Sequence, residues 1–121
     1  MNNGYFQIKS HRNYYLDEEG NVYRQRDGKY LMLTPDLSNG HPRVNLDGRN
    51  EMISRLMGEA FIPNEYPERT LIFHMDGDSM NNALGNLIWV TPMEAQLLSR
   101  YLPEYRNALL YRMRKNLKVT P

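Results

Sequence analysis

The chain has 121 residues, of which 40% are hydrophobic and 24% are charged, and its formal net charge is +1. This length suffices for one modest core and excludes two ordinary domains. Because the chain contains no cysteine, disulfide bridges and thiolate zinc sites are excluded, and we expect a cytoplasmic protein.

The pattern of apolar residues gives no sign of a membrane protein. No apolar run approaches the roughly 18 residues that a membrane-spanning helix needs. The first ten residues lack the basic-then-apolar pattern of a signal peptide. We therefore expect a soluble protein with no membrane partner.

The charges are unevenly distributed along the chain. Residues 1–98 hold 9 Lys and Arg against 13 Asp and Glu, a balance of −4, whereas residues 99–121 hold 6 against 1, a balance of +5. Two interpretations of this basic tail stay open, a face that contacts phosphate and a merely solvated face. The candidate nucleic-acid contacts are Arg106, Arg112, Arg114, Lys115 and Lys118.

Short strand-like runs alternate with turn signals in the first half of the chain. The runs, at residues 5–9, 14–16, 21–24, 29–33 and 43–46, are rich in aromatic and β-branched side chains. They predict antiparallel hairpins. Tight two-residue turns are expected at Asp27-Gly28 and Asp47-Gly48, because these dipeptides tolerate positive φ.

The periodicity changes in the second half. Apolar residues at helical spacing from Ile53 predict a short helix that Pro63 ends. Residues 70–74 and 87–91 then read as two strands around a loop rich in Asp, Gly and Asn. Thr91 with Glu94 forms a capping box that begins a helix running to about Tyr101.

A further helix is predicted from Pro103. Its apolar side would hold Leu102, Tyr105, Leu109, Leu110 and Met113, although Arg106 falls on the same side. The fold class is therefore α+β: antiparallel β-hairpins, a short helix, a ββα unit and a basic amphipathic C-terminal helix. We divide the chain into a β-rich part at 1–52, the ββα part at 53–101 and the basic helix at 102–121.

Three stretches carry a family resemblance. They are Gly58-Glu59-Ala60-Phe61-Ile62-Pro63-Asn64, then His74-Met75-Asp76-Gly77-Asp78, then Asn81-Asn82 with Asn86-Leu87-Ile88-Trp89-Val90-Thr91. In this order and spacing they resemble the HNH homing endonucleases of bacteriophages. Residues 15–23 also look like the small DNA-binding motif that often precedes this nuclease domain. The resemblance covers about residues 5–96 and implies a phage-encoded protein acting in the cytoplasm of a bacterial host.

The resemblance also implies a chemistry. The ββα unit of this family holds one divalent metal, Mg²⁺ or Mn²⁺, against the scissile phosphate of double-stranded DNA. Carried over by position, His74 is the general base, Asn86 orients its imidazole and Asn82 orders the loop between them.

Two positions depart from the family's metal ligands. Members place Asp or Asn before the histidine and Asn or His after the helical glutamate, where this chain has Phe73 and Ala95. Neither side chain offers a lone pair to a hard cation. Ser54 stands where members usually have a histidine. We therefore predict no bound metal and no cofactor, unless Asp76, Asp78 or Glu94 substitutes as ligand.

If the missing ligands are the only defect, Phe73→Asp with Ala95→Asn should restore metal binding. Three functions stay open. The chain is a nucleic-acid-binding protein of HNH homing-endonuclease descent with weakened or lost hydrolysis, an active metal-dependent HNH endonuclease, or a non-catalytic protein that binds a host protein or ribonucleoprotein. The acidic body favours the last, since it opposes contact with phosphates.

Other conspicuous residues have simpler interpretations. Trp89 is expected in the core, because strand aromatics usually fill cores. The nine tyrosines fit a half-buried sheet better than a base-stacking platform. His11 and His41 lie in polar, turn-like contexts and receive no role.

Overall fold

The computed structural model describes residues 4–100 and 103–115. The predictions for Leu102 and Lys118, and for a helix end at Tyr101, concern positions outside the described residues. Four antiparallel strands begin the chain: β1 (Phe6–Ile8), β2 (His11–Leu16), β3 (Val22–Arg26) and β4 (Lys29–Met32), paired in chain order. A separate hairpin follows, formed by β5 (Arg43–Leu46) and β6 (Arg49–Met52).

The two predicted tight turns are confirmed. Asp27 and Asp47 have φ of 53° and 54°, and the glycines after them have φ of 76° and 87°. Positive φ at both central residues matches the twist of the flanking strands, so each turn fixes the register of its hairpin.

The second half contains α1 (Ile53–Phe61), β7 (Leu71–His74), the short 3₁₀ helix η1 (Leu84–Asn86), β8 (Leu87–Val90), α2 (Pro92–Arg100) and α3 (Pro103–Arg114). The strands β7 and β8 pair antiparallel, so β7, β8 and α2 form the expected ββα unit. The α+β class is confirmed. Most boundaries differ from prediction by one or two residues, but β2 begins three residues earlier than predicted and β6 was not predicted. None of the helices in the described ranges has the length and apolarity needed to cross a bilayer.

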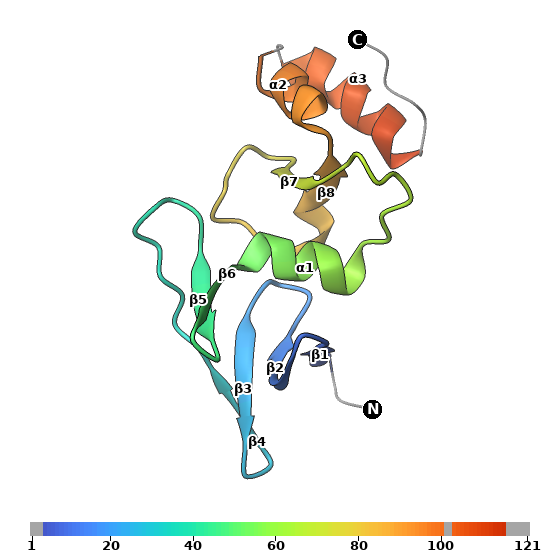
Figure 1. Cartoon of the computed structure of the whole chain (residues 1–121). Helices are drawn as coiled ribbons and strands as arrows, with labels where there is room; N and C mark the ends of the chain where they lie inside the picture. The colour runs from blue at the N-terminus through green and yellow to red at the C-terminus, as the bar shows by residue number, and fades with distance from the viewer. Residues whose placement is uncertain (1–3, 101–102, 116–121) are drawn as a thin grey trace.

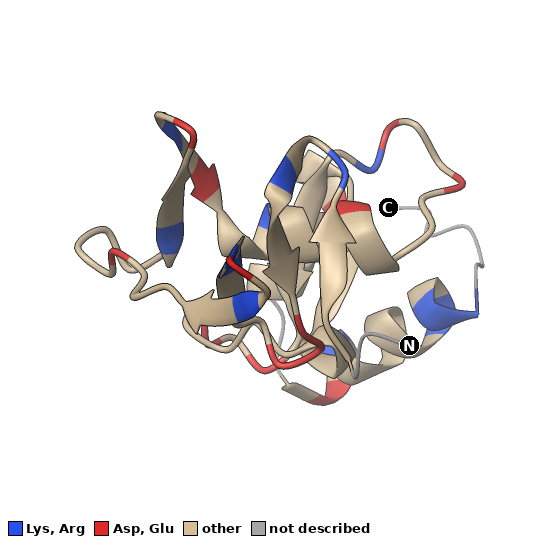
Figure 2. Cartoon of the chain, turned by 90° about the horizontal axis from the view of Figure 1, so that it is seen from below, with Lys and Arg blue, Asp and Glu red and all other residues tan. Residues whose placement is uncertain are grey.

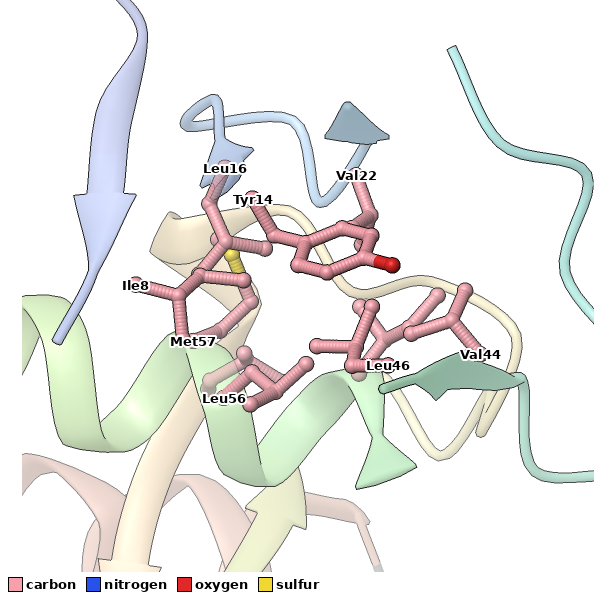
Figure 3. Close-up of a cluster of buried hydrophobic side chains, with 10 residues drawn as sticks. Ile8, Tyr14, Leu16, Val22, Val44, Leu46, Leu56 and Met57 are labelled. Atoms are coloured by element: carbon pink, nitrogen blue, oxygen red, sulfur yellow. The ribbon is translucent and has the colours of Figure 1, made fainter. Parts of the chain in front are cut away.

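Helix α1 lies between the N-terminal strands and the β7–β8 hairpin (Figure 1). Charged residues of both signs are interspersed over the strands and loops around it rather than segregated (Figure 2). The apolar side of α1 carries the first core, in which side chains from β1, β2, β3 and β5 converge on Leu56 and Met57 (Figure 3). This core joins residues on both sides of position 52, so the proposed division into three parts stays a prediction.

The other side of α1 meets the hairpin closely. An added Cβ at Gly58 would lie 2.9 Å from Trp89 Cζ2, so only glycine allows this approach. Trp89 is buried, as expected, and its indole N–H donates a hydrogen bond of 3.0 Å to the carbonyl of Ile62. The helix and hairpin are thereby held as one packed unit.

A second core lies between the ββα unit and α3. Its buried residues are Val90, Leu98, Leu110 and Met113, with partly buried Phe73, Met75, Ile88, Ala95 and Leu109 packed against them. The predicted apolar side of α3 is correct for its C-terminal half and wrong at Tyr105, which is 59% exposed. Because 106, 110 and 113 share one helical face, docking through Leu110 and Met113 turns Arg106 inward and Tyr105 outward.

Candidate functional site

The site is organised around His74, the last residue of β7. His74 pairs with Leu87 across the hairpin, and its side chain is only 9% exposed. Its Nε2 lies 2.8 Å from Oδ1 of Asn82, which is also buried. When Nε2–H donates this bond, the neutral ring keeps a lone pair on Nδ1. That tautomer is the one in which the ring can accept a proton, as a general base must.

The expected roles of the two asparagines are exchanged. Asn86 Oδ1 accepts a bond of 2.9 Å from the Asp76 amide, and its Nδ2 donates to Asp76 Oδ1 and to the Asn81 carbonyl, each at 2.9 Å. The orienting role assigned to Asn86 thus falls to Asn82. Asn86 lies one residue before Leu87, the strand partner of His74, and its side chain is bonded to Asp76 and Asn81 rather than to the imidazole.

Asp76 and Asp78, which the sequence suggested as substitute metal ligands, accept hydrogen bonds from other residues of their own loop. Asp76 accepts hydrogen bonds from Asn81, from the Asp78 amide and from Asn86. The bond from the Asn81 side chain contributes most to lowering the pKa of Asp76 below its ordinary value. Asp78 Oδ1 accepts from the Met80 amide at 2.9 Å. The loop is a self-bonded turn whose carboxylates stabilise its own backbone.

Glu94 is also committed elsewhere. Its carboxylate binds Arg69 through two bonds, Nε to Oε1 at 3.1 Å and Nη2 to Oε2 at 3.0 Å, and both side chains are buried. The predicted capping box is confirmed, since the Thr91 amide donates to Glu94 Oε1 and the Glu94 amide donates to Thr91 Oγ1. Glu94 therefore closes the start of α2, and its carboxylate is already paired with Arg69.

The two positions where the family resemblance calls for metal ligands lie in the second core. Phe73 and Ala95 both pack against the cluster that α3 completes. No group of three His, Cys, Asp or Glu side chains in the described ranges is arranged to hold a metal. The residues present do not fit a divalent cation, because apolar side chains cannot replace its hydration shell.

The N-terminal sheet contacts the loop of the site through its β2–β3 turn. An added Cβ at Gly20, where φ is +89°, would lie 2.8 Å from the backbone oxygen of Asn82. The Leu84 amide donates a bond of 2.8 Å to the Glu18 carbonyl. The β2–β3 turn, within the segment that resembles a small DNA-binding motif, therefore rests on the loop that orients His74.

The turn itself is built around Asp17. Its carboxylate accepts bonds from the amides of Glu19 and Asn21, from the Asn21 side chain and from the Tyr23 hydroxyl, the last at 2.7 Å. Burial, the largest single influence, raises the pKa of Asp17, but these bonds together outweigh it and lower the pKa. Burial, with the bond to Asp17 in second place, raises the pKa of Tyr23 to about 12.

A surface cavity of about 370 Å³ opens beside His74. It is lined by His41, Ile72, Phe73, His74, Gly77, Ser79, Leu98, Ser99 and Arg106. His41 comes from the β4–β5 loop, and a hydrogen bond from Ser79 Oγ to the Gly40 carbonyl joins that loop to the site. No sequence signal identified His41 or Ser79. For Arg106 the signal was its place on the apolar side of α3.

The predicted basic residues do not form one face. Arg106 enters the cavity, whereas Arg112, Arg114 and Lys115 lie at the other end of α3. Arg114 donates a long bond of 3.4 Å to the Gly85 carbonyl, and the Lys115 amine lies 5.7 Å from the Tyr111 ring centre. A phosphate contact by these three residues stays a prediction.

Comparison with known proteins agrees with this geometry. No family model matches the chain. An uncharacterized HNH endonuclease of Acanthamoeba polyphaga mimivirus is 32% identical over 95 residues, covering 72% of this chain and 27% of that protein. Among solved structures, that of the HNH homing endonuclease I-HmuI, determined for DNA binding and cleavage, has a TM-score of 0.60 and 26% identity. The match covers 95% of this chain and 61% of I-HmuI. The chain thus spans about a quarter of one relative and less than two thirds of the other.

Proposed function

Because this chain belongs with the HNH homing endonucleases in sequence and fold, we propose that it binds double-stranded DNA and that its phosphodiester hydrolysis is weakened or lost. The observation that carries the proposal is the packing of Phe73 and Ala95 into the second core. The general-base half of the site is intact, since His74 is buried and bonded to Asn82. The half that would stabilise the leaving oxygen through a metal has become apolar.

The loss of the metal has a predictable kinetic consequence. A general base typically contributes about 10²- to 10⁴-fold in rate. Cleavage of a phosphodiester needs far more than this, because charge that develops on the phosphate and the leaving oxygen must also be stabilised. An oriented imidazole without the metal therefore supports binding and positioning better than turnover.

The test pairs binding with cleavage. Fluorescence anisotropy of a labelled duplex should show affinity that falls steeply with salt, because phosphate contacts release counterions. Supercoiled plasmid with Mg²⁺ or Mn²⁺ should be nicked no faster by the wild-type protein than by His74→Ala. Nicking well above the His74→Ala background would establish the active endonuclease instead.

A non-catalytic role against a host protein or ribonucleoprotein is the second candidate. The acidic balance of −4 over residues 1–98 favours it, since like charges oppose approach to DNA. Absence of salt-dependent duplex binding would select this candidate. The bacteriophage origin and the cytoplasmic location stay predictions, and the curated relative comes from a giant virus.

A further inference from the structure

The cavity beside His74 contains an unsatisfied cationic donor. Arg106 Nε is buried and has no hydrogen-bond partner. Buried polar groups are almost always paired, so this exception calls for an explanation. The Arg106 side chain lies on the buried face of α3, where Leu110 and Met113 hold the helix against the ββα unit. The structure thus keeps a guanidinium at this place at a cost in desolvation.

The guanidinium reaches the loop that follows His74. The Cβ position of Gly77 lies 3.9 Å from Arg106 Nη1, and Gly77 has a φ of +80°. A side chain there would be strained, because the backbone at this position has a positive φ. Several separate segments therefore meet around one open volume: β7 with the loop after it, the β4–β5 loop with His41, α2 with Leu98 and Ser99, and α3 with Arg106.

The lining of the cavity suits an anion. It combines the guanidinium with two imidazoles and with the side chains of Ser79 and Ser99, whose hydroxyls donate to the carbonyls of Gly40 and Ala95. No Asp or Glu lines it, and the nearby carboxylates of Asp76 and Asp78 are bonded within their own loop. Arginine presents donors in a planar fork that matches two phosphate oxygens.

We infer that this cavity binds one backbone phosphate of double-stranded DNA, with the Arg106 guanidinium holding the phosphate in place of a divalent metal. The inference rests on the proposed DNA binding and assigns it a specific anchor. Arg106 supplies a fixed positive charge from α3, close to the strand position that Phe73 has made apolar. The same charge disfavours any cation in the cavity. Loss of metal ligands and gain of an arginine are then two parts of one change, from hydrolysis to retention of the phosphate.

The test uses the full chain and a labelled duplex of about 20 base pairs in the anisotropy assay. Arg106→Met keeps the length and apolar stem of the side chain and removes its charge. We expect it to weaken binding by about tenfold or more, since bonds to charged groups are strong. The slope of log affinity against log salt should fall in magnitude by about 0.9, the value for one phosphate contact. The matched control Arg100→Met removes the same charge from the exposed end of α2 and should change affinity by less than about threefold, as expected for a screened surface charge.

A second pair of variants avoids the buried side chain. Ser99 is exposed and lines the cavity, so Ser99→Asp should repel the phosphate without disturbing the core. Gln96→Asp adds the same charge on an exposed position of α2 outside the cavity and should bind nearly as well as wild type.

The outcomes separate the two proposals. If wild type binds the duplex and both cavity variants bind like their controls, the phosphate site is refuted while DNA binding stands. If wild type shows no salt-dependent duplex binding, both proposals are refuted. If Arg106→Met fails to fold by circular dichroism, the Ser99→Asp comparison decides the matter alone.

Discussion

Restoring the two lost metal ligands should not restore a metal site while Arg106 is present. Sequence alone suggests that Phe73→Asp with Ala95→Asn is sufficient. The structure places Phe73 in the lining of the cavity that Arg106 enters, and Ala95 against the second core that also packs on Phe73. We therefore expect the double variant to form an ion pair between the new carboxylate and the guanidinium, and the triple variant with Arg106→Met to bind Mn²⁺.

The magnitude follows from Coulomb's law. In a cavity of this size, a guanidinium and a divalent ion about 6 Å apart repel by about 5 kcal/mol at an effective dielectric constant of about 20. That energy corresponds to about four orders of magnitude in affinity. The triple variant should thus bind Mn²⁺ about ten-thousandfold more tightly than the double variant.

Folding must be verified before binding is compared. Truncating a partly buried Phe73 costs about 3–5 kcal/mol by analogy with large-to-small core changes, against a total stability of about 5–15 kcal/mol. Circular dichroism melting would establish that each variant folds, and isothermal calorimetry with Mn²⁺ would measure affinity, with Arg106→Met alone as the control. Equal Mn²⁺ affinity in the double and triple variants would refute the placement of Arg106. A folded triple variant without Mn²⁺ binding would show that the backbone has departed from the metal geometry.

Three further predictions concern stability and site geometry. The hydrogen bond to Glu51, aided by that to Asp47 and opposed by burial, raises the pKa of His11 above its ordinary 6.5. The stabilisation of the fold by protonated His11 should therefore be complete below pH 6.5 and disappear as pH rises through the folded-state pKa. Urea titrations of wild type and Glu51→Gln between pH 5 and 8 would test this. Glu94→Gln should cost about 3–5 kcal/mol in thermal denaturation by leaving Arg69 buried and uncompensated, whereas the apolar pair Arg69→Met with Glu94→Leu should recover most of that loss. Gly20→Ala should destabilise the fold by about 1–3 kcal/mol and shift the His74 ring resonances in NMR spectra, and an unchanged ring would show that the turn does not position the site.

Local patterns predicted the elements because each was encoded by neighbouring residues. The Asp-Gly turns and the Thr91–Glu94 capping box depend on contacts within four residues, and the structure has both. Strand β6 (Arg49–Met52) was not seen as a strand-like run, since its residues are exposed or only half-buried and carry little apolar alternation.

The site was less predictable because its contacts join distant segments. Which asparagine meets His74 depends on the path of a loop, and position along the chain pointed to Asn86 rather than Asn82. His41 approaches the site through a β4–β5 loop whose course no local periodicity encodes. Arg106 was visible as an exception on an apolar stripe, but the cavity that it enters could be known only once α3 had docked.

The bond from the Leu84 amide to the Glu18 carbonyl has a consequence for hydrogen exchange. Leu84 belongs to the loop of the ββα unit, while Glu18 belongs to a turn of the N-terminal sheet. Exchange of this amide with solvent requires the loop and the sheet to separate. The Leu84 amide should therefore exchange with the free energy of a large cooperative unit rather than that of an ordinary surface loop. Heavy-water labelling at this one position would report whether the surroundings of His74 can open independently of the sheet beneath them.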